Sequence, residues 1–97
     1  MERASAAQKI AASWSQEQAD AVCREMAKAG AAAAHDLARL AVEETGIGRV
    51  HYKVLKNLFG AEGTWKSIED EKTVGVLTRD TKRGVIEVGT PAGVIAV

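Results

Sequence analysis

The feature that most constrains this chain is a change of composition near residue 41. Fifteen of the 18 alanines lie at or before Ala41, whereas most of the valines and glycines follow it. Alanine has the highest helix propensity, and β-branched residues favour strands. The sequence therefore predicts a helical first part and a strand-forming last part, in a mixed α/β chain.

A break flanked by serines separates the first two predicted helices. The first helix is predicted over residues 3–12, before Ser13-Trp14-Ser15 interrupts the alanine-rich pattern. Ser15 and Gln18 have the spacing of a capping box, in which two side chains satisfy free backbone N–H groups at a helix start. A second helix is therefore predicted to begin at Gln16.

The second helix is predicted to be a single rod over residues 16–45. Its apolar residues recur at three- and four-residue steps, and Gly46 offers a left-handed stop. Gly30 interrupts the pattern and costs up to ~1 kcal/mol relative to alanine. A rod of about 30 residues would be ~45 Å long, which exceeds the width of a compact domain of this size and indicates something larger. The apolar stripe comprises Ala19, Val22, Cys23, Met26, Ala27, Ala33, Leu37, Leu40 and Ala41.

The rest of the chain is predicted to form a third helix, a β-hairpin and a final strand. The hairpin is indicated by two β-rich runs around a polar turn. Pro91 ends it, and the apolar run that follows is typical of a buried parallel strand. The predicted ranges are 49–62 for the helix, 64–71 for a short turn or helix, 73–78 and 85–88 for the hairpin strands, and 92–97 for the final strand.

Charge and cysteine content exclude several classes of protein. Thirteen Lys+Arg balance 13 Asp+Glu, which excludes a strongly basic nucleic-acid binder, so no nucleic-acid partner is expected. Cys23 is the only cysteine, which excludes an internal disulfide and a multi-cysteine zinc site. No apolar run reaches ~18 residues, so no membrane partner is expected and the default location is the cytoplasm.

The residues that could carry chemistry form no catalytic constellation in the sequence. Cys23 lies on the apolar stripe, where a small buried hydrophobe is favoured over a nucleophile. His35 and His51 are interpreted as helix-surface or packing residues rather than general bases. The turn Gly46-Ile47-Gly48 lacks the third glycine and the preceding strand of a dinucleotide-binding fingerprint. No catalytic, cofactor-binding or metal-ligating residue is therefore expected in this chain.

Three charged clusters are interpreted as structural. Glu43 and Glu44 oppose the helix dipole near a C-terminus, which favours a salt bridge to another element. Lys53 and Lys56 could contact a phosphate, although a solvent-facing role is favoured. Residues 69–72 are interpreted as a solvated connector.

Several motifs resemble the aldehyde dehydrogenase superfamily. The run Leu40-Ala41-Val42-Glu43-Glu44-Thr45-Gly46-Ile47-Gly48 is similar to its signature LAxxETGxG. Lys53-Val54-Leu55-Lys56-Asn57 is similar to the DKxxKN motif of the CoA-acylating branch, of the acetaldehyde and sulfoacetaldehyde type, although Tyr52 stands where aspartate is usual. Pro91-Ala92-Gly93-Val94-Ile95-Ala96 resembles the segment that leads into the nucleotide-binding domain.

The resemblance implies that this chain is the N-terminal portion of a longer α/β enzyme. It would be a single incomplete domain over residues 1–97. Residues 1–71 would supply a layer of about three helices, and residues 72–97 a β-hairpin and the first strand of a Rossmann-like domain. The resemblance also implies that the oxyanion-stabilising asparagine, the nucleophilic cysteine and the acid–base residue lie beyond residue 97, so Cys23 is not that nucleophile.

For the intact enzyme, the resemblance implies oxidation of an aldehyde with NAD or NADP. A cysteine thiolate attacks the aldehyde, hydride passes to the cofactor, and the thioester is transferred to CoA or, in the hydrolytic branch, to water. The implied partners are the rest of the dehydrogenase chain and further copies in a homo-oligomer. The 97-residue chain by itself is expected to bind no cofactor and to be inactive.

Two alternatives remain open at the level of sequence. A stand-alone helical oligomerisation or binding module is supported by the long alanine-rich amphipathic helix, which could pair with a second copy. A small enzyme that depends on Cys23 or His51 is the other.

Overall fold

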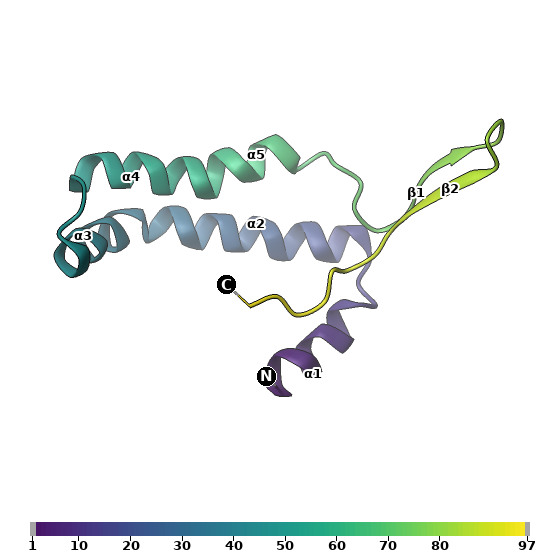
Figure 1. Cartoon of the computed structure of the whole chain (residues 1–97), viewed down its shortest axis with the longest axis horizontal. Helices are drawn as coiled ribbons and strands as arrows, with labels where there is room; N and C mark the ends of the chain where they lie inside the picture. The colour runs from purple at the N-terminus through teal and green to yellow at the C-terminus, as the bar shows by residue number, and fades with distance from the viewer. Residues whose placement is uncertain (1, 97) are drawn as a thin grey trace. The chain divides into compact units, whose positions relative to one another are not determined.

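A computed structural model describes residues 2–96 (Figure 1). The chain divides into two compact units, with boundaries after Asp20 and Asp70. We call the residues up to Asp20 together with those from Glu71 onward the hairpin unit, and Ala21–Asp70 the helical unit. The elements in order are α1 (Glu2–Ala11), α2 (Gln16–Ala32), α3 (Ala34–Thr45), α4 (Val50–Leu58), the π-helical turn η1 (Phe59–Gly63), α5 (Thr64–Ile68), β1 (Gly75–Asp80) and β2 (Val85–Gly89).

The predicted start of the second helix is confirmed in atomic detail. The backbone N–H of Ser15 donates to Oε1 of Gln18 at 2.9 Å, and the backbone N–H of Gln18 donates to Oγ of Ser15 at 3.2 Å. These reciprocal bonds are the two halves of a capping box. The first helix is also confirmed, within one residue of its predicted ends.

The predicted β-hairpin is confirmed as an antiparallel pair, β1 and β2, with a bulge between Val76 and Thr78. Its turn is closed by Asp80, whose Oδ1 accepts the backbone N–H groups of Lys82 and Arg83, both at 3.0 Å. Gly84 completes the turn with φ of 66°. β2 ends at Gly89, so Pro91 lies outside the ladder as predicted.

β1 runs from Gly75 to Asp80, so it begins and ends two residues later than the predicted strand over 73–78. At its start, the side chain of Gln16 takes up the backbone N–H groups of the two preceding residues. Oε1 of Gln16 accepts the N–H groups of Thr73 and Val74 at 2.8 and 2.9 Å. Nε2 of the same side chain donates to Oδ1 of Asp20 at 2.8 Å and to Oγ1 of Thr73 at 3.1 Å. One carboxamide therefore ties the first turn of α2 to the base of the hairpin.

The predicted final strand differs from the structure. No strand is formed over residues 90–96, and Val97 lies outside the described residues. A strand requires a neighbour that pairs with its backbone groups, and the ladder of the described chain contains only β1 and β2. An apolar run can predict the tendency to form a strand but cannot supply its neighbour.

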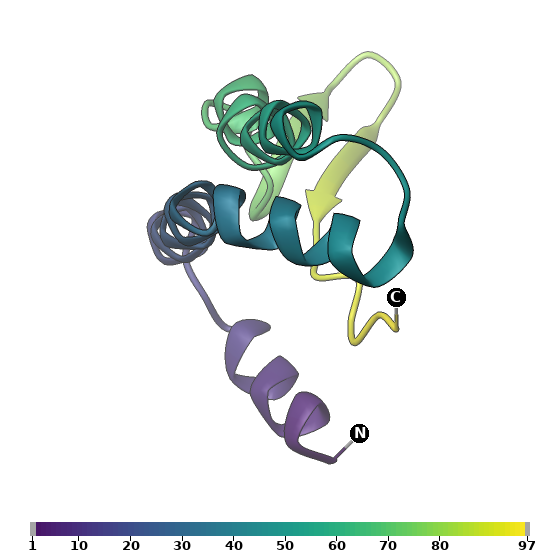
Figure 2. The same cartoon turned by 90° about the vertical axis from the view of Figure 1, so that its left-hand side faces the viewer.

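In the helical unit, the single rod predicted over residues 16–45 is wrong, because α2 and α3 are separated at Ala33. Ala33 has φ −86° and ψ 0°, and α3 turns away from the axis of α2 (Figure 2). The bend lets the small faces of Ala34 and Ala38, 1% and 0% exposed, pack towards α4. Nδ2 of Asn57 in α4 donates to the carbonyl oxygen of Ala34 at 3.1 Å. Tertiary packing thus bends the chain within a run of four alanines, residues 31–34, whose own propensity favours a helix.

The third helix does not end near residue 62 as predicted, because the short turn or helix predicted over residues 64–71 is formed as α5 and continues it. α4, η1 and α5 form one helical stretch from Val50 to Ile68, which runs alongside the later part of α2 (Figure 1). The N–H of Thr64 bonds the carbonyl oxygen of Phe59, five residues earlier, so a π turn carries the helix through Gly60 and Gly63. A Cβ at Gly30 would lie 3.2 Å from Cβ of Ala61, which explains the glycine in α2 as a point of close approach to η1.

Candidate functional site

Cys23 lies in α2 and is exposed, so its interpretation as a buried hydrophobe is wrong. It stands on the apolar stripe, beside a hollow that it lines together with Ala61 and Trp65, and this neighbourhood leaves its side chain exposed. Among residues 2–96, no hydrogen bond or ion pair involves its thiol, and no neighbouring cation or base that would activate a nucleophile is paired with it.

The two histidines are exposed on helix surfaces, as predicted. His35 lies in the first turn of α3. His51 lies in the first turn of α4, where its ring centroid is 4.0 Å from that of Tyr52 at an interplanar angle of 44°. Neither ring is joined to a thiol or hydroxyl in the described hydrogen bonds, so no acid–base arrangement is formed around them.

The acidic pair and the glycine turn have local structural roles. Glu43 accepts from Arg39 of the same helix at 3.3 Å, so the predicted salt bridge to another element is not the one that forms. Gly46, at φ 66°, donates its N–H to the carbonyl oxygen of Val42, which confirms the predicted helix stop. A Cβ at Gly48 would lie 3.1 Å from Cε of Lys53, so the lysine stem lies over this turn. The turn is a helix cap rather than a phosphate loop.

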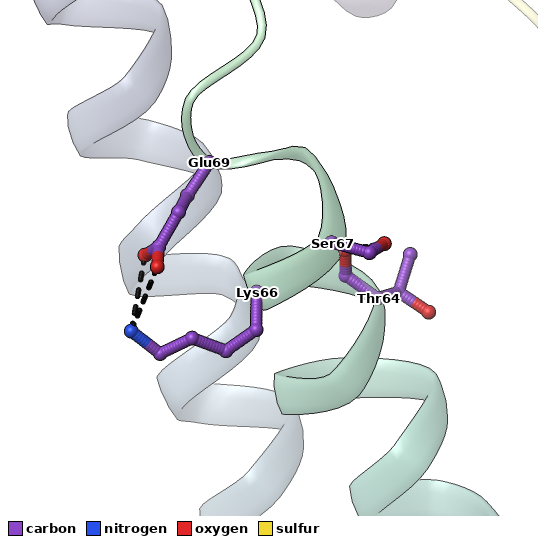
Figure 3. Close-up of polar contacts among 4 residues, drawn as sticks. All are labelled: Thr64, Lys66, Ser67 and Glu69. Atoms are coloured by element: carbon purple, nitrogen blue, oxygen red, sulfur yellow. Dashed lines mark hydrogen bonds and ion pairs between the residues drawn. The ribbon is translucent and has the colours of Figure 1, made fainter.

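The connector that follows α5 begins with an ion pair (Figure 3). Nζ of Lys66 donates to both carboxylate oxygens of Glu69, at 2.9 and 3.2 Å. This hydrogen bond and the charge of Glu69 raise the pKa of Lys66 above its ordinary value. The two charges neutralise each other at the protein surface. The ion pair joins residues three positions apart at the C-terminal end of α5.

The surface hollows described below do not bring together side chains that could form a catalytic or metal-binding site. One hollow of about 550 Å³ in the hairpin unit is lined by apolar side chains and backbone, including Trp14, Val74 and Pro91. Another, about 400 Å³ in the helical unit, mixes the cations of Arg24 and Lys66 with carboxylates. Within residues 2–96, no cluster of three or more His, Cys, Asp or Glu residues could hold a metal ion. Nor does any helix there have the length and apolar character for a membrane crossing.

The most distinctive surface is an apolar groove in the helical unit. Two hollows of about 270 and 370 Å³ adjoin along η1, since both are lined by Gly60 and Ala61. We call their combined lining the apolar groove; its residues are Cys23, Met26, Ala27, Gly30, Leu37, Lys56, Asn57, Gly60, Ala61, Thr64, Trp65 and Ile68.

Several large apolar side chains that line the groove are exposed to solvent. Met26 is 68% exposed, and Leu37 and Ile68 are each about half exposed. The buried apolar core of the described residues, by contrast, is Ala34, Ala38 and Val54. Exposed apolar surface of this kind is typical of interaction sites and ligand-binding grooves.

Sequence reasoning found some of these residues and missed others. The stripe correctly brings Cys23, Met26 and Leu37 to one surface, but it gives no sign that Gly60 and Ala61 form the opposite wall. The sequence predicts Gln16 only as the first residue of a helix. Its bonds to residues 57 and 58 positions away have no local signal.

Comparison with known proteins gives a consistent set of relatives, although no protein-family model matches the sequence. The chain is 44% identical over 95 residues to the bifunctional aldehyde-alcohol dehydrogenase AdhE of Escherichia coli (strain K12), covering 98% of this chain and 11% of that protein. It is 36% identical over 96 residues to the succinate-semialdehyde dehydrogenase (acetylating) of Clostridium kluyveri, covering 99% and 21%.

A solved structure agrees with these relatives. An acetylating aldehyde dehydrogenase from Geobacillus thermoglucosidasius superposes with a TM-score of 0.80 at 48% identity, covering 84% of this chain and 18% of that one. The chain therefore spans about a fifth or less of the length of each of these three relatives.

Proposed function

Because the chain belongs to the aldehyde dehydrogenase superfamily, we propose that it is the opening part of a longer NAD(P)-dependent acylating aldehyde dehydrogenase. It matches the N-terminal portion of the CoA-acylating branch of that superfamily. The observation that carries the proposal is the identity across almost the whole chain to proteins several times longer. Its exposed apolar surface supports the same reading.

The reaction proposed for the intact enzyme converts an aldehyde, CoA and NAD(P)⁺ into an acyl-CoA, NAD(P)H and a proton, through a cysteine thioester. The described residues do not fit the cofactor, because the glycine turn at Gly46 and Gly48 caps a helix and lies under the stem of Lys53. We therefore assign no step of the reaction to this chain. That it supplies no reacting residue stays a prediction.

The proposed role of the chain is structural. Its partner is the remainder of the dehydrogenase polypeptide, with further copies in a homo-oligomer and with no nucleic acid or membrane as partner. We propose a cytoplasmic location, which the exposed thiol of Cys23 supports because reducing compartments keep such thiols free. The alternative is a stand-alone helical binding module; the bend at Ala33 removes the long rod on which that reading depended.

A chimaera tests the proposal. This chain replaces the matched segment of the E. coli bifunctional relative, and CoA-dependent NADH production is measured with short aldehydes. The chimaera should retain at least a tenth of the relative's rate, and the 97-residue chain by itself should give none. The alcohol dehydrogenase activity of the same polypeptide reports whether the chimaera has folded. Normal alcohol dehydrogenase activity without CoA-dependent aldehyde oxidation would refute the proposal.

A further inference from the structure

We propose that the base of the hairpin is a conformational latch, in which the carboxamide of Gln16 holds Thr73 and Val74 out of the β ladder. We call these three residues the latch. When the latch opens, both strands lengthen by one residue, and Val74 pairs with Thr90. The latch therefore selects between a hairpin tied to the first turn of α2 and a longer hairpin released from it.

The ladder stops short of residues that favour strands. Thr73 and Val74 are β-branched, yet the register ends at the pair of Gly75 with Gly89. One further step in the same register would pair Val74 with Thr90, and the next would reach Pro91, which has no N–H to donate. Instead, the N–H groups of Thr73 and Val74 donate to Oε1 of Gln16 at 2.8 and 2.9 Å. The carboxamide and an extended ladder thus compete for the same short segment of backbone.

Gly75 is the hinge of the latch. Its φ is 74°, a left-handed backbone conformation that glycine adopts about as readily as a right-handed or extended one. With this φ, the residues before Gly75 leave the line of β1 and reach Gln16. A change of Gly75 to extended backbone would realign them with the strand, and a glycine makes that change without a steric penalty.

Gly89 distinguishes the closed latch from the open one. A Cβ at Gly89 would overlap the carbonyl oxygen of Thr73, so the closed latch admits only glycine at this position. In the open latch Thr73 lies opposite residue 91, two positions further along, and the overlap is removed. Residues 73–75 and 89–91 all line the hollow of about 550 Å³, so both segments border open space into which they can move.

Two substitutions that act on different atoms should open the latch in the same way. Gln16→Ala removes the acceptor, whereas Gly89→Ala keeps Gln16 and forces Thr73 away. Cross-strand backbone NOEs between Val74 and Thr90, measured by NMR on the 97-residue chain, should be at least threefold stronger in both variants than in the unmodified chain. The NOEs that join β1 to β2 should remain in all three proteins.

The side-chain amide protons of Gln16 give a second measurement. In Gly89→Ala they should move to the chemical shifts of a solvated carboxamide, although the substitution does not touch Gln16. Gly60→Ala is the matched control, because Gly60 lies in the helical unit with nothing within 4 Å of a built Cβ, and it should leave these shifts unchanged.

Three outcomes would overturn the latch. Loss of the β1–β2 NOEs in either variant would do so, because the open state keeps the ladder. Unchanged Gln16 side-chain shifts in Gly89→Ala would do so as well, as would a new Val74–Thr90 pair in only one of the two variants. The added pair lies at the open end of the ladder, where exchange stays fast, so NOEs rather than hydrogen exchange detect it.

Discussion

The helical unit and the hairpin unit are each stabilised internally by a different kind of interaction. The helical unit has a small apolar seam, in which Ala34, Ala38 and Val54 are buried between α3 and α4. The described part of the hairpin unit has no buried side chain, and its elements are joined by the strand ladder and by the carboxamide of Gln16. Water competes with exposed hydrogen bonds but not with buried apolar contacts, so the hairpin unit should open first.

The largest expected effect comes from overfilling the seam of the helical unit. Ala38→Leu adds a branched side chain at a position with no exposed surface, and it should destabilise α3 and α4 by about 1–3 kcal/mol. Hydrogen exchange followed by mass spectrometry would show faster exchange in those two helices. Ala32→Leu, at an exposed alanine, is the matched control and should change exchange little. Equal effects of the two substitutions would show that the seam does not hold the unit.

A smaller effect is expected from the hairpin unit when its polar anchor is removed. Gln16→Ala deletes the acceptor of the N–H groups of Thr73 and Val74, and water can replace it, so the cost should be about 0.5–1.5 kcal/mol. The amide protons of these two residues should exchange faster, while those of α4 remain unchanged. Glu17→Ala, the adjacent exposed position, is the control. Unchanged exchange at Thr73 and Val74 would contradict the anchor.

The smallest effect concerns the surface pair of the helical unit. Glu69 raises the pKa of Lys66 above 10.5, so the contribution of the pair is fully present below pH 10.5 and is lost as pH rises through the raised pKa. Glu69→Gln should lower the pKa of Lys66, measured by NMR titration of its side chain, and Asp70→Asn should lower it less. An unchanged titration in Glu69→Gln would contradict the ion pair. Salt should weaken the effect, because the pair is exposed.

The sequence predicted the features that depend on near neighbours. The capping box of Ser15 and Gln18, the stop at Gly46 and the hairpin turn all join residues within four positions, so the local pattern contains the whole interaction. The bend at Ala33 could not be predicted in this way, because the alanines on both sides of it favour a helix and the packing of α3 against α4 accounts for its position. The π turn at Phe59–Gly63 has only the weak signal of two glycines.

The candidate surface was predictable in part. The apolar stripe of α2 follows from its spacing, and the structure keeps Cys23 and Met26 on it. The sequence indicated that Cys23 is buried because apolar stripes normally face a core. Whether a stripe is covered depends on what packs against it, and that information lies outside the periodicity of one helix.

In the sequence, the helical unit is inserted between two segments that the side chain of Gln16 joins by hydrogen bonds. The bond from Thr73 to Gln16 closes a loop whose ends are 57 positions apart. In the unfolded chain this segment is a flexible loop, and the entropic cost of closing such a loop grows only with the logarithm of its length, about 0.6 kcal/mol for each doubling. Length changes inside the segment that leave the helical unit folded should therefore change the cost of joining Gln16 to Thr73 very little.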